Sequence, residues 1–207
     1  MSAATSLPKV TAACALATLA CMPAFAQKTW DMASGSMEPT IHLKQQVTSN
    51  LFAYMFAKPA RGDVVAFTVP GGTELRIYRV VAVPGDTIAY DVHRQLSLNG
   101  ARVSRSRTDD AAPAPWMDST VYIEEFPGAR HLVMLAPASA DLVTFPELAR
   151  NAACTTAPGA FSCKMPEGQY FLMGDNREHA QDSRFLGFIP GENIAARVSS
   201  GDSVGAR

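Results

Sequence analysis

Short apolar runs separated by proline and glycine turns dominate this chain, and they limit the folds open to it. Runs rich in β-branched and aromatic residues occupy positions 63–69, 76–83, 95–100, 131–135 and 169–174. The turns between them contain Pro70-Gly71-Gly72, Pro84-Gly85 and Pro166-Glu167-Gly168. Strong helical periodicity is scarce. Short strands punctuated by such turns predict a mainly β fold.

The length and the net charge of the chain limit its domain organisation and its possible partners. The 207 residues suffice for one domain with an insertion. Positions 103–120 are polar and rich in proline and alanine, so we expect a loop there, inside an inserted smaller subdomain at about residues 95–165. The formal net charge is −1 and no run of lysine or arginine occurs. No nucleic-acid partner is therefore expected.

The first 26 residues have the features of an export segment. Residues 10–26 contain no charged side chain, and their length is at the short end for a bilayer span. Pro23 interrupts this run, and the Ala-Phe-Ala tripeptide at 24–26 fits a small-x-small cleavage site. We expect residues 1–26 to be a cleaved signal peptide or, alternatively, an uncleaved membrane anchor. In both cases residues 27–207 would lie outside the cytoplasm.

Cys154 and Cys163 are the two cysteines that remain outside the export segment. They bracket a turn-rich loop, and no further cysteine or histidine is close to them in the sequence, so no metal site is expected. In an oxidising compartment a local disulfide between them is the expected arrangement.

Four motifs follow one another along the chain. They are "SGSMEPT" at 34–40, "RGDVVAF" at 61–67, "YRVVAVPGD" at 78–86 and "PEGQYFLMGDNREHAQDSRFLGFIP" at 166–190. In these motifs and their order the chain resembles the bacterial type I signal peptidases, the Ser/Lys endopeptidases that remove export signals. The resemblance implies antiparallel sheets in a partly open barrel with an inserted smaller β subdomain. It also implies a periplasmic location and an apolar surface that meets the membrane. Trp30, Phe52, Tyr54 and Phe56 are candidates for a membrane-facing or substrate-facing surface, and ordinary core packing explains Phe52 and Phe56 equally well.

The resemblance also assigns roles to residues of the first motif. Ser36 would be the nucleophile, and its backbone N–H would form the oxyanion hole with the Ser34 hydroxyl. Met37 and Pro39 would shape the substrate cleft. Acyl transfer by a serine needs such a hydroxyl, oxyanion donors and a base, and it needs no cofactor.

The base is where this chain departs from the family. The family's lysine stands directly before the Arg-Val-Val of the third motif, and here that position is Tyr78. The small hydroxyl residue that commonly orients the lysine is replaced by Ala180, and Lys44-Gln45 stands where a Gly-Asp pair is usual. Several alternatives stay open for the base: a Tyr78 phenolate favoured by Arg76, Lys44, or one of the histidines His42, His93, His131 and His179.

The charged residues of the fourth motif support the site or stiffen the fold. Asp175, Arg177, Asp182 and Arg184 alternate in charge. Arg79 of the third motif is expected to pair with Asp175 or Asp182.

Three functions are compatible with these observations. The first is a signal peptidase that cleaves exported preproteins. The second is a catalytically silent relative that binds exported or secretion-system peptides along a sheet edge. The third is a dedicated peptidase for a pilin or another secretion-system substrate. The expected partners are such peptides and the membrane surface.

Overall fold

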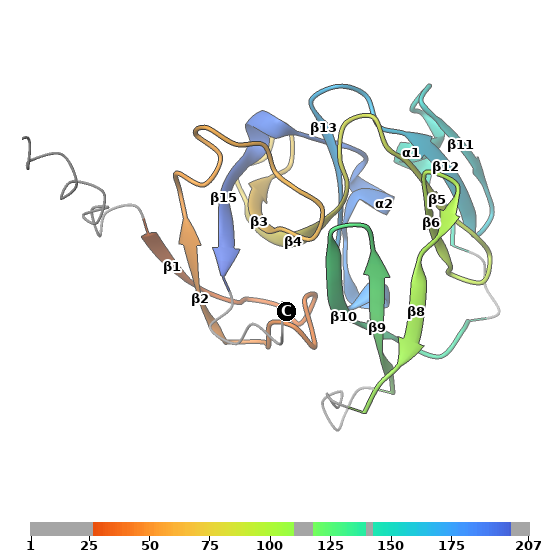
Figure 1. Ribbon diagram of the computed structural model, residues 1–207, viewed down its shortest axis with the longest axis horizontal. Coiled ribbons are helices and arrows are strands. Elements are labelled where there is room, and N and C mark those ends of the chain that lie inside the picture. The colour runs from red at the N-terminus through yellow and green to blue at the C-terminus, as the bar shows by residue number, and fades with distance from the viewer. Residues whose placement is uncertain (1–26, 110–117, 140–142, 200–207) are drawn as a thin grey trace, which may run out of the picture.

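The computed structural model describes residues 27–109, 118–139 and 143–199, and most of its regular structure is β-strand. Within these residues, a seven-stranded sheet has the order β1-β2-β15-β3-β4-β13-β14, and all neighbouring strands are antiparallel. Its strands are β1 (Gln27–Asp31), β2 (Gln46–Asn50), β3 (Val64–Thr68), β4 (Leu75–Ala82), β13 (Gln169–Met173), β14 (Ile189–Pro190) and β15 (Ile194–Ser199). Figure 1 shows this sheet curling from β1 and β2 through β15 to β3 and β4. The predicted mainly β fold with curled antiparallel sheets is confirmed.

The direction of the apolar side chains determines which strands are central. β15 alternates strictly between buried and exposed residues, as expected of a strand with one solvated face. In β4, by contrast, residues 77–82 are all buried. Val80 belongs to the main core and Val81 to a second core, so β4 is covered on both faces. This strand, which carries Tyr78, is therefore held rigidly.

The chain between β4 and β13 forms two smaller sheets, of order β10-β9-β8 and β11-β12-β5-β6-β7. Their strands are β5 (Thr87–Tyr90), β6 (Leu96–Leu98), β7 (Ala101–Arg102), β8 (Ser104–Arg107), β9 (Thr120–Phe126), β10 (Ala129–Leu135), β11 (Cys154–Ala157) and β12 (Ala160–Lys164). The second core joins these strands to the main sheet, for example through Phe161 on β12 and Phe171 on β13. The limits of an inserted subdomain at about 95–165 stay a prediction.

One sequence-based expectation is wrong in this region. Residues 103–120 were expected to form a loop, but β8 occupies four of them and pairs with β9. An edge strand is held by backbone hydrogen bonds to one neighbour, so its side chains need not be apolar.

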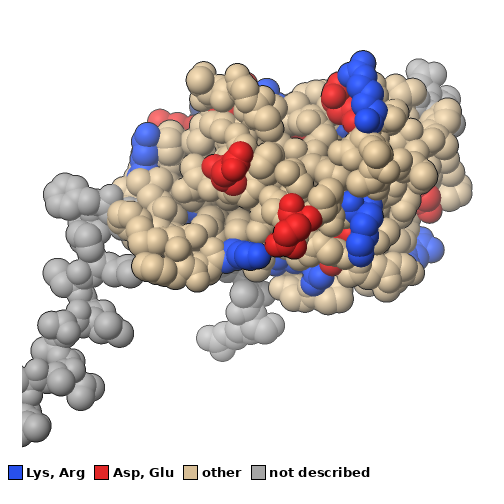
Figure 2. Space-filling view, turned by 90° about the horizontal axis from the view of Figure 1, so that it is seen from above, with Lys and Arg blue, Asp and Glu red and all other residues tan. Residues whose placement is uncertain are grey.

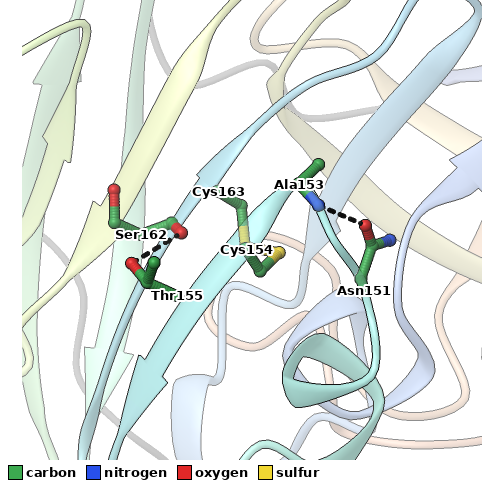
Figure 3. Close-up of a disulfide and its surroundings, with 6 residues drawn as sticks. All are labelled: Asn151, Ala153, Cys154, Thr155, Ser162 and Cys163. Atoms are coloured by element: carbon green, nitrogen blue, oxygen red, sulfur yellow. Dashed lines mark hydrogen bonds between the residues drawn. A yellow bond between two sulfur atoms is a disulfide. The ribbon is translucent and has the colours of Figure 1, made fainter.

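The expected disulfide joins β11 to β12 (Figure 3). Cys154 and Cys163 are direct cross-strand partners, with Cα atoms 4.1 Å apart. Beside them, the Thr155 hydroxyl donates to the Ser162 carbonyl at 3.5 Å. Because β11 is the edge strand of its sheet, the crosslink secures it, and closing so short a loop contributes about 2–3 kcal/mol.

Helical structure in the described residues is confined to short segments. These are α1 (Pro146–Ala149), η2 (Arg177–His179), α2 (Ser183–Leu186) and η3 (Gly191–Asn193). None of the helices in this part of the chain has the length and hydropathy needed to cross a bilayer. Residues 1–26, predicted to be a signal peptide or an anchor, lie outside the described residues.

Candidate active site

Ser36 lies in the loop between β1 and β2. The residue is only 6% exposed, and its Oγ is 3.0 Å from Ser34 Oγ. Ser34 itself is exposed. The loop folds back on itself, because the Met37 carbonyl accepts the N–H groups of Thr40 and Ile41, each at 2.9 Å. The two serine hydroxyls therefore meet at the boundary between the interior and solvent.

The residues after Ser36 anchor this loop. Met37 is fully buried in the main core, and Pro39 is buried as well. Between them, the Glu38 carboxylate accepts the Leu43 N–H at 3.0 Å and contacts His42 Nδ1 at 2.6 Å. The predicted role of Met37 and Pro39 in a substrate cleft stays a prediction.

The turn that follows β13 holds the Ser36 loop in place. Asn176 donates its backbone N–H to the Ser36 carbonyl at 3.1 Å and its side-chain Nδ2 to the Gly35 carbonyl at 2.9 Å. A Cβ atom added to Gly174 would lie 2.7 Å from that Ser36 oxygen. Glycine is therefore required here by the close approach of two backbones. Sequence reasoning missed Asn176, although it stands inside the fourth motif.

The Tyr78 side chain extends from β4 toward Gly174 and Ser36. Its ring lies 3.4 Å from the position of that added Gly174 Cβ and packs against Phe67, with ring centroids 5.6 Å apart. Burial raises the pKa of the Tyr78 phenol, and the charge of Asp182 raises it further. Hydrogen bonding to Ser36 opposes this shift only in part. The phenol is therefore neutral at pH 7, which disfavours a phenolate base.

The other candidate bases do not replace the missing lysine amine. Among the described residues, no lysine or histidine side chain forms a hydrogen bond with Ser36. The following candidates are exposed: His42, Lys44, His93 and His179. Ala180 is buried beside Gly174, where it presents a methyl group instead of a hydroxyl. The arrangement thus places two serine hydroxyls, those of Ser34 and Ser36, beside a neutral phenol.

Two buried ion pairs form around the turn. Arg79 binds Asp175, one of its two expected partners, through Nε at 2.9 Å and Nη2 at 2.6 Å. Arg184 binds Asp182 through Nε and Nη2, both at 2.8 Å. Asp182 also accepts the Gly174 N–H at 3.0 Å. The pairs therefore restrain the backbone on both sides of the turn.

Arg177 has a partner that no motif indicated. Glu124 on β9 is fully buried and accepts hydrogen bonds from both Nη atoms of Arg177, one of them at 3.0 Å, and from Arg105 at 3.2 Å. Burial opposes its charged form, but the charges and hydrogen bonds of Arg177 and Arg105 outweigh burial and lower the pKa of Glu124. The two partners are 53 residues apart in the sequence, so local patterns gave no sign of the contact.

His131, one of the histidines considered as a base, lies beside this pair. It is the cross-strand neighbour of Glu124, and its Nε2 is 3.6 Å from Glu124 Oε2. Neither ring nitrogen has a hydrogen-bond partner among the described residues. Burial, followed by the positive charges of Arg79 and Arg177, holds the pKa of His131 well below its usual 6.5. The imidazole is therefore neutral in the folded protein.

We expect the natural chain to lose stability faster than a His131→Leu variant as the pH falls from about 6.5 to 5. Below its ordinary pKa the imidazole binds a proton in the unfolded chain but not in the folded one, so protons favour unfolding. The additional loss approaches about 1.4 kcal/mol per pH unit. The lowered pKa of Glu124 affects the stability only in a more acidic range, below the usual carboxyl pKa of 4.5. Urea unfolding at several pH values measures the effect, and parallel curves for the two proteins would contradict it.

Comparisons with known proteins point to one family. A model of the family described as signal peptidase, peptidase S26, matches residues 5–200. The signal peptidase I of Pseudomonas aeruginosa is 29% identical over 197 residues, which cover 84% of this chain and 64% of that protein. The signal peptidase I of Aquifex aeolicus is 30% identical over 191 residues, which cover 83% of this chain and 73% of that protein.

This chain spans less than two thirds of the length of the Pseudomonas aeruginosa relative. A solved signal peptidase I from Enterococcus faecalis aligns with a TM-score of 0.39 and 23% identity, covering 69% of this chain and 97% of that chain.

Proposed function

Because this chain belongs to the signal peptidase family, peptidase S26, we propose that it is a serine endopeptidase of the signal peptidase I type with reduced activity. Its substrates are exported preproteins, cleaved at the periplasmic face of the membrane. The observation that carries the proposal is the 3.0 Å contact between Ser36 Oγ and Ser34 Oγ, next to a turn that binds the Ser36 carbonyl.

The proposed reaction begins with attack of Ser36 Oγ on the carbonyl carbon of the scissile bond. The Ser36 N–H and the Ser34 hydroxyl stabilise the negative charge that develops on the carbonyl oxygen. The Ser36 N–H is available for this, since it makes no hydrogen bond within the described residues. As the C–N bond breaks, the proton released by the Ser36 hydroxyl passes to the leaving amine, and water then hydrolyses the acyl-enzyme.

The missing amine limits the rate of this reaction. A neutral phenol at position 78 forms a hydrogen bond with Ser36. It does not remove the proton of the Ser36 hydroxyl at pH 7. A positioned base contributes a factor of about 10²–10⁴ to such reactions. Acylation is therefore expected to be slower by a comparable factor than at a site with a neutral lysine.

An edge of β4 offers a place for an extended substrate. β3 pairs with residues 75–79 of β4, whereas β13 pairs with β4 only from Arg79 to Ala82. The second edge of residues 75–78 therefore has no strand partner among the described residues, and it ends at Tyr78 beside Ser36. A peptide that adds a strand to this edge would bring its backbone to the serine.

A silent peptide-binding relative is the second candidate function. It is favoured by the neutral phenol at the position of the base, together with the methyl group of Ala180. Such a protein would retain the strand edge without turnover.

Incubation of the full chain in detergent with a preprotein distinguishes these functions. We expect slow cleavage after a small residue, which the matched Ser36→Ala preparation lacks. Loss of cleavage in His179→Ala would identify the imidazole as the base. If the natural chain does not cleave the preprotein but binds its signal region in an anisotropy measurement, the silent function replaces the enzymatic one.

The membrane surface is the proposed second partner, and an exposed loop supports it. In the loop after β2, drawn in orange in Figure 1, the residues Leu51, Phe52, Met55 and Phe56 are 40%, 46%, 57% and 95% exposed. Figure 2 shows that the face seen from above is largely uncharged, with only scattered charged groups. Tyr54 and Trp30 differ from the expectation, because both are partly buried against the main core.

Replacement of Phe56 by serine should weaken binding of the full chain to phosphatidylethanolamine–phosphatidylglycerol vesicles by about tenfold, because a phenyl ring no longer enters the bilayer interface. Vesicle sedimentation measures the partition coefficient. Val92→Ser is the matched control, since Val92 is an exposed apolar residue outside this loop, 49% exposed. Equal partition of the two variants would exclude the loop as the membrane contact.

A further inference from the structure

A carboxylate outside all four motifs is connected to the nucleophile loop. Glu124 comes from β9, in the three-stranded sheet, and its side chain is fully buried. It binds the Nη1 and Nη2 atoms of Arg177, which is 1% exposed. An arginine gripped through two parallel hydrogen bonds is fixed in orientation as well as in position.

Arg177 is in turn bonded to the turn at residues 174–176, which holds the Ser36 loop. Its Nε donates to the Gly174 carbonyl at 3.2 Å. Gly174 is the residue whose backbone approaches the Ser36 carbonyl too closely for any side chain. One residue before Arg177, Asn176 binds the carbonyls of Gly35 and Ser36.

The same sheet reaches the turn a second time. The N–H of Met134, on β10, donates to the Asp175 carbonyl at 2.8 Å, and Met134 forms a β-bridge with Asn176. β10 is the hairpin partner of β9. The turn is therefore held between the main sheet on one side and the β9–β10 hairpin on the other.

We infer that Glu124 is a positioning residue for the reaction of Ser36 and that it acts through Arg177. The inference rests on the proposed role of Ser36 as the nucleophile. The alternative is that the buried pair contributes only to folding. The two differ in one respect, because a positioning residue controls the local environment of residue 36 in molecules that are fully folded.

A thiol at position 36 reports that environment without requiring peptidase activity. In the full chain carrying Ser36→Cys, alkylation by iodoacetamide is followed by mass spectrometry of the tryptic peptide spanning residues 29–44, which contains no natural cysteine. Glu124→Gln keeps the shape of the side chain but removes the charge that holds Arg177. We expect it to accelerate alkylation of the introduced thiol by roughly tenfold, because the turn opens locally more often. Glu124→Asp, which restores the charge, should recover part of the slow rate.

Glu125→Gln is the matched control. Glu125 is the next residue of β9, but it is about half exposed and pairs with the exposed Arg130. We expect the alkylation rate and its pH profile to be unchanged in this variant. If Glu124→Gln does not fold, Glu124→Leu combined with Arg177→Met removes both charges and leaves an apolar contact, and it should also accelerate alkylation.

Folded Glu124→Gln protein whose introduced thiol reacts at the rate of the Glu125→Gln control would overturn the inference, whatever its melting temperature. This outcome is distinct from failure of the proposed function, which the cleavage of preprotein tests separately. If the natural chain does cleave, Glu124→Gln should lower kcat by a similar factor and leave KM unchanged, because the strand edge on β4 is not altered.

Discussion

A chain carrying Tyr78→Lys together with Ala180→Ser is expected to cleave preprotein about 10²–10⁴ times faster than the natural chain, the factor that a positioned base contributes. The Tyr78 side chain already lies beside Ser36 in a buried environment. An amine placed there loses solvation, which lowers its pKa toward neutrality and leaves part of it unprotonated. The serine hydroxyl at position 180 would orient the amine, since Ala180 packs against the Gly174 turn.

Initial rates of preprotein cleavage in detergent measure this gain. The rate of the double variant should rise with pH through the lowered pKa of the new lysine, and Asp182 should keep that pKa from falling as far as burial alone would take it. Tyr78→Lys alone should gain less. A triple variant that also carries Ser36→Ala serves as the control and should be inactive. A folded double variant that is no faster than the natural chain would show that more than the base and its partner has been lost.

Arg79→Met is expected to lower the free energy of unfolding by about 3–5 kcal/mol, because it leaves a buried carboxylate without its partner. Asp175 is 1% exposed and binds Arg79 through both of its oxygens. The same substitution also removes a hydrogen bond from Arg79 Nη1 to the Gly62 carbonyl at 2.9 Å. Urea unfolding of the two proteins at pH 7 measures the difference.

Arg130→Met provides the comparison for this experiment. Arg130 pairs with Glu125, but their side chains are 52% and 51% exposed, so its loss should cost no more than about 1 kcal/mol. Arg79→Met combined with Asp175→Leu should recover much of the loss, since no unpaired charge then remains. Similar effects of Arg79→Met and Arg130→Met would mean that Asp175 finds another partner or reaches water.

The central strands could be predicted because they are covered on both faces. The apolar runs at 63–69, 76–83 and 169–174 correspond to β3, β4 and β13. A strand buried on both faces needs a nearly continuous apolar sequence, which is visible without the fold. β8 has the sequence Ser-Arg-Ser-Arg and was expected to be a loop, since only its pairing with β9 makes it a strand.

The sequence by itself determined the family, the mainly β fold class, and the substitution of Tyr78 and Ala180 for the residues usual there. These conclusions depend on the identity and order of residues within short segments. The tertiary structure decided the rest. It keeps the Tyr78 phenol neutral and pairs Arg177 with Glu124. It also brings Asn176 into a hydrogen bond with the Gly35 carbonyl, 141 residues away in the sequence. Burial and hydrogen bonding act through space, and only the packed sheets bring these distant residues together.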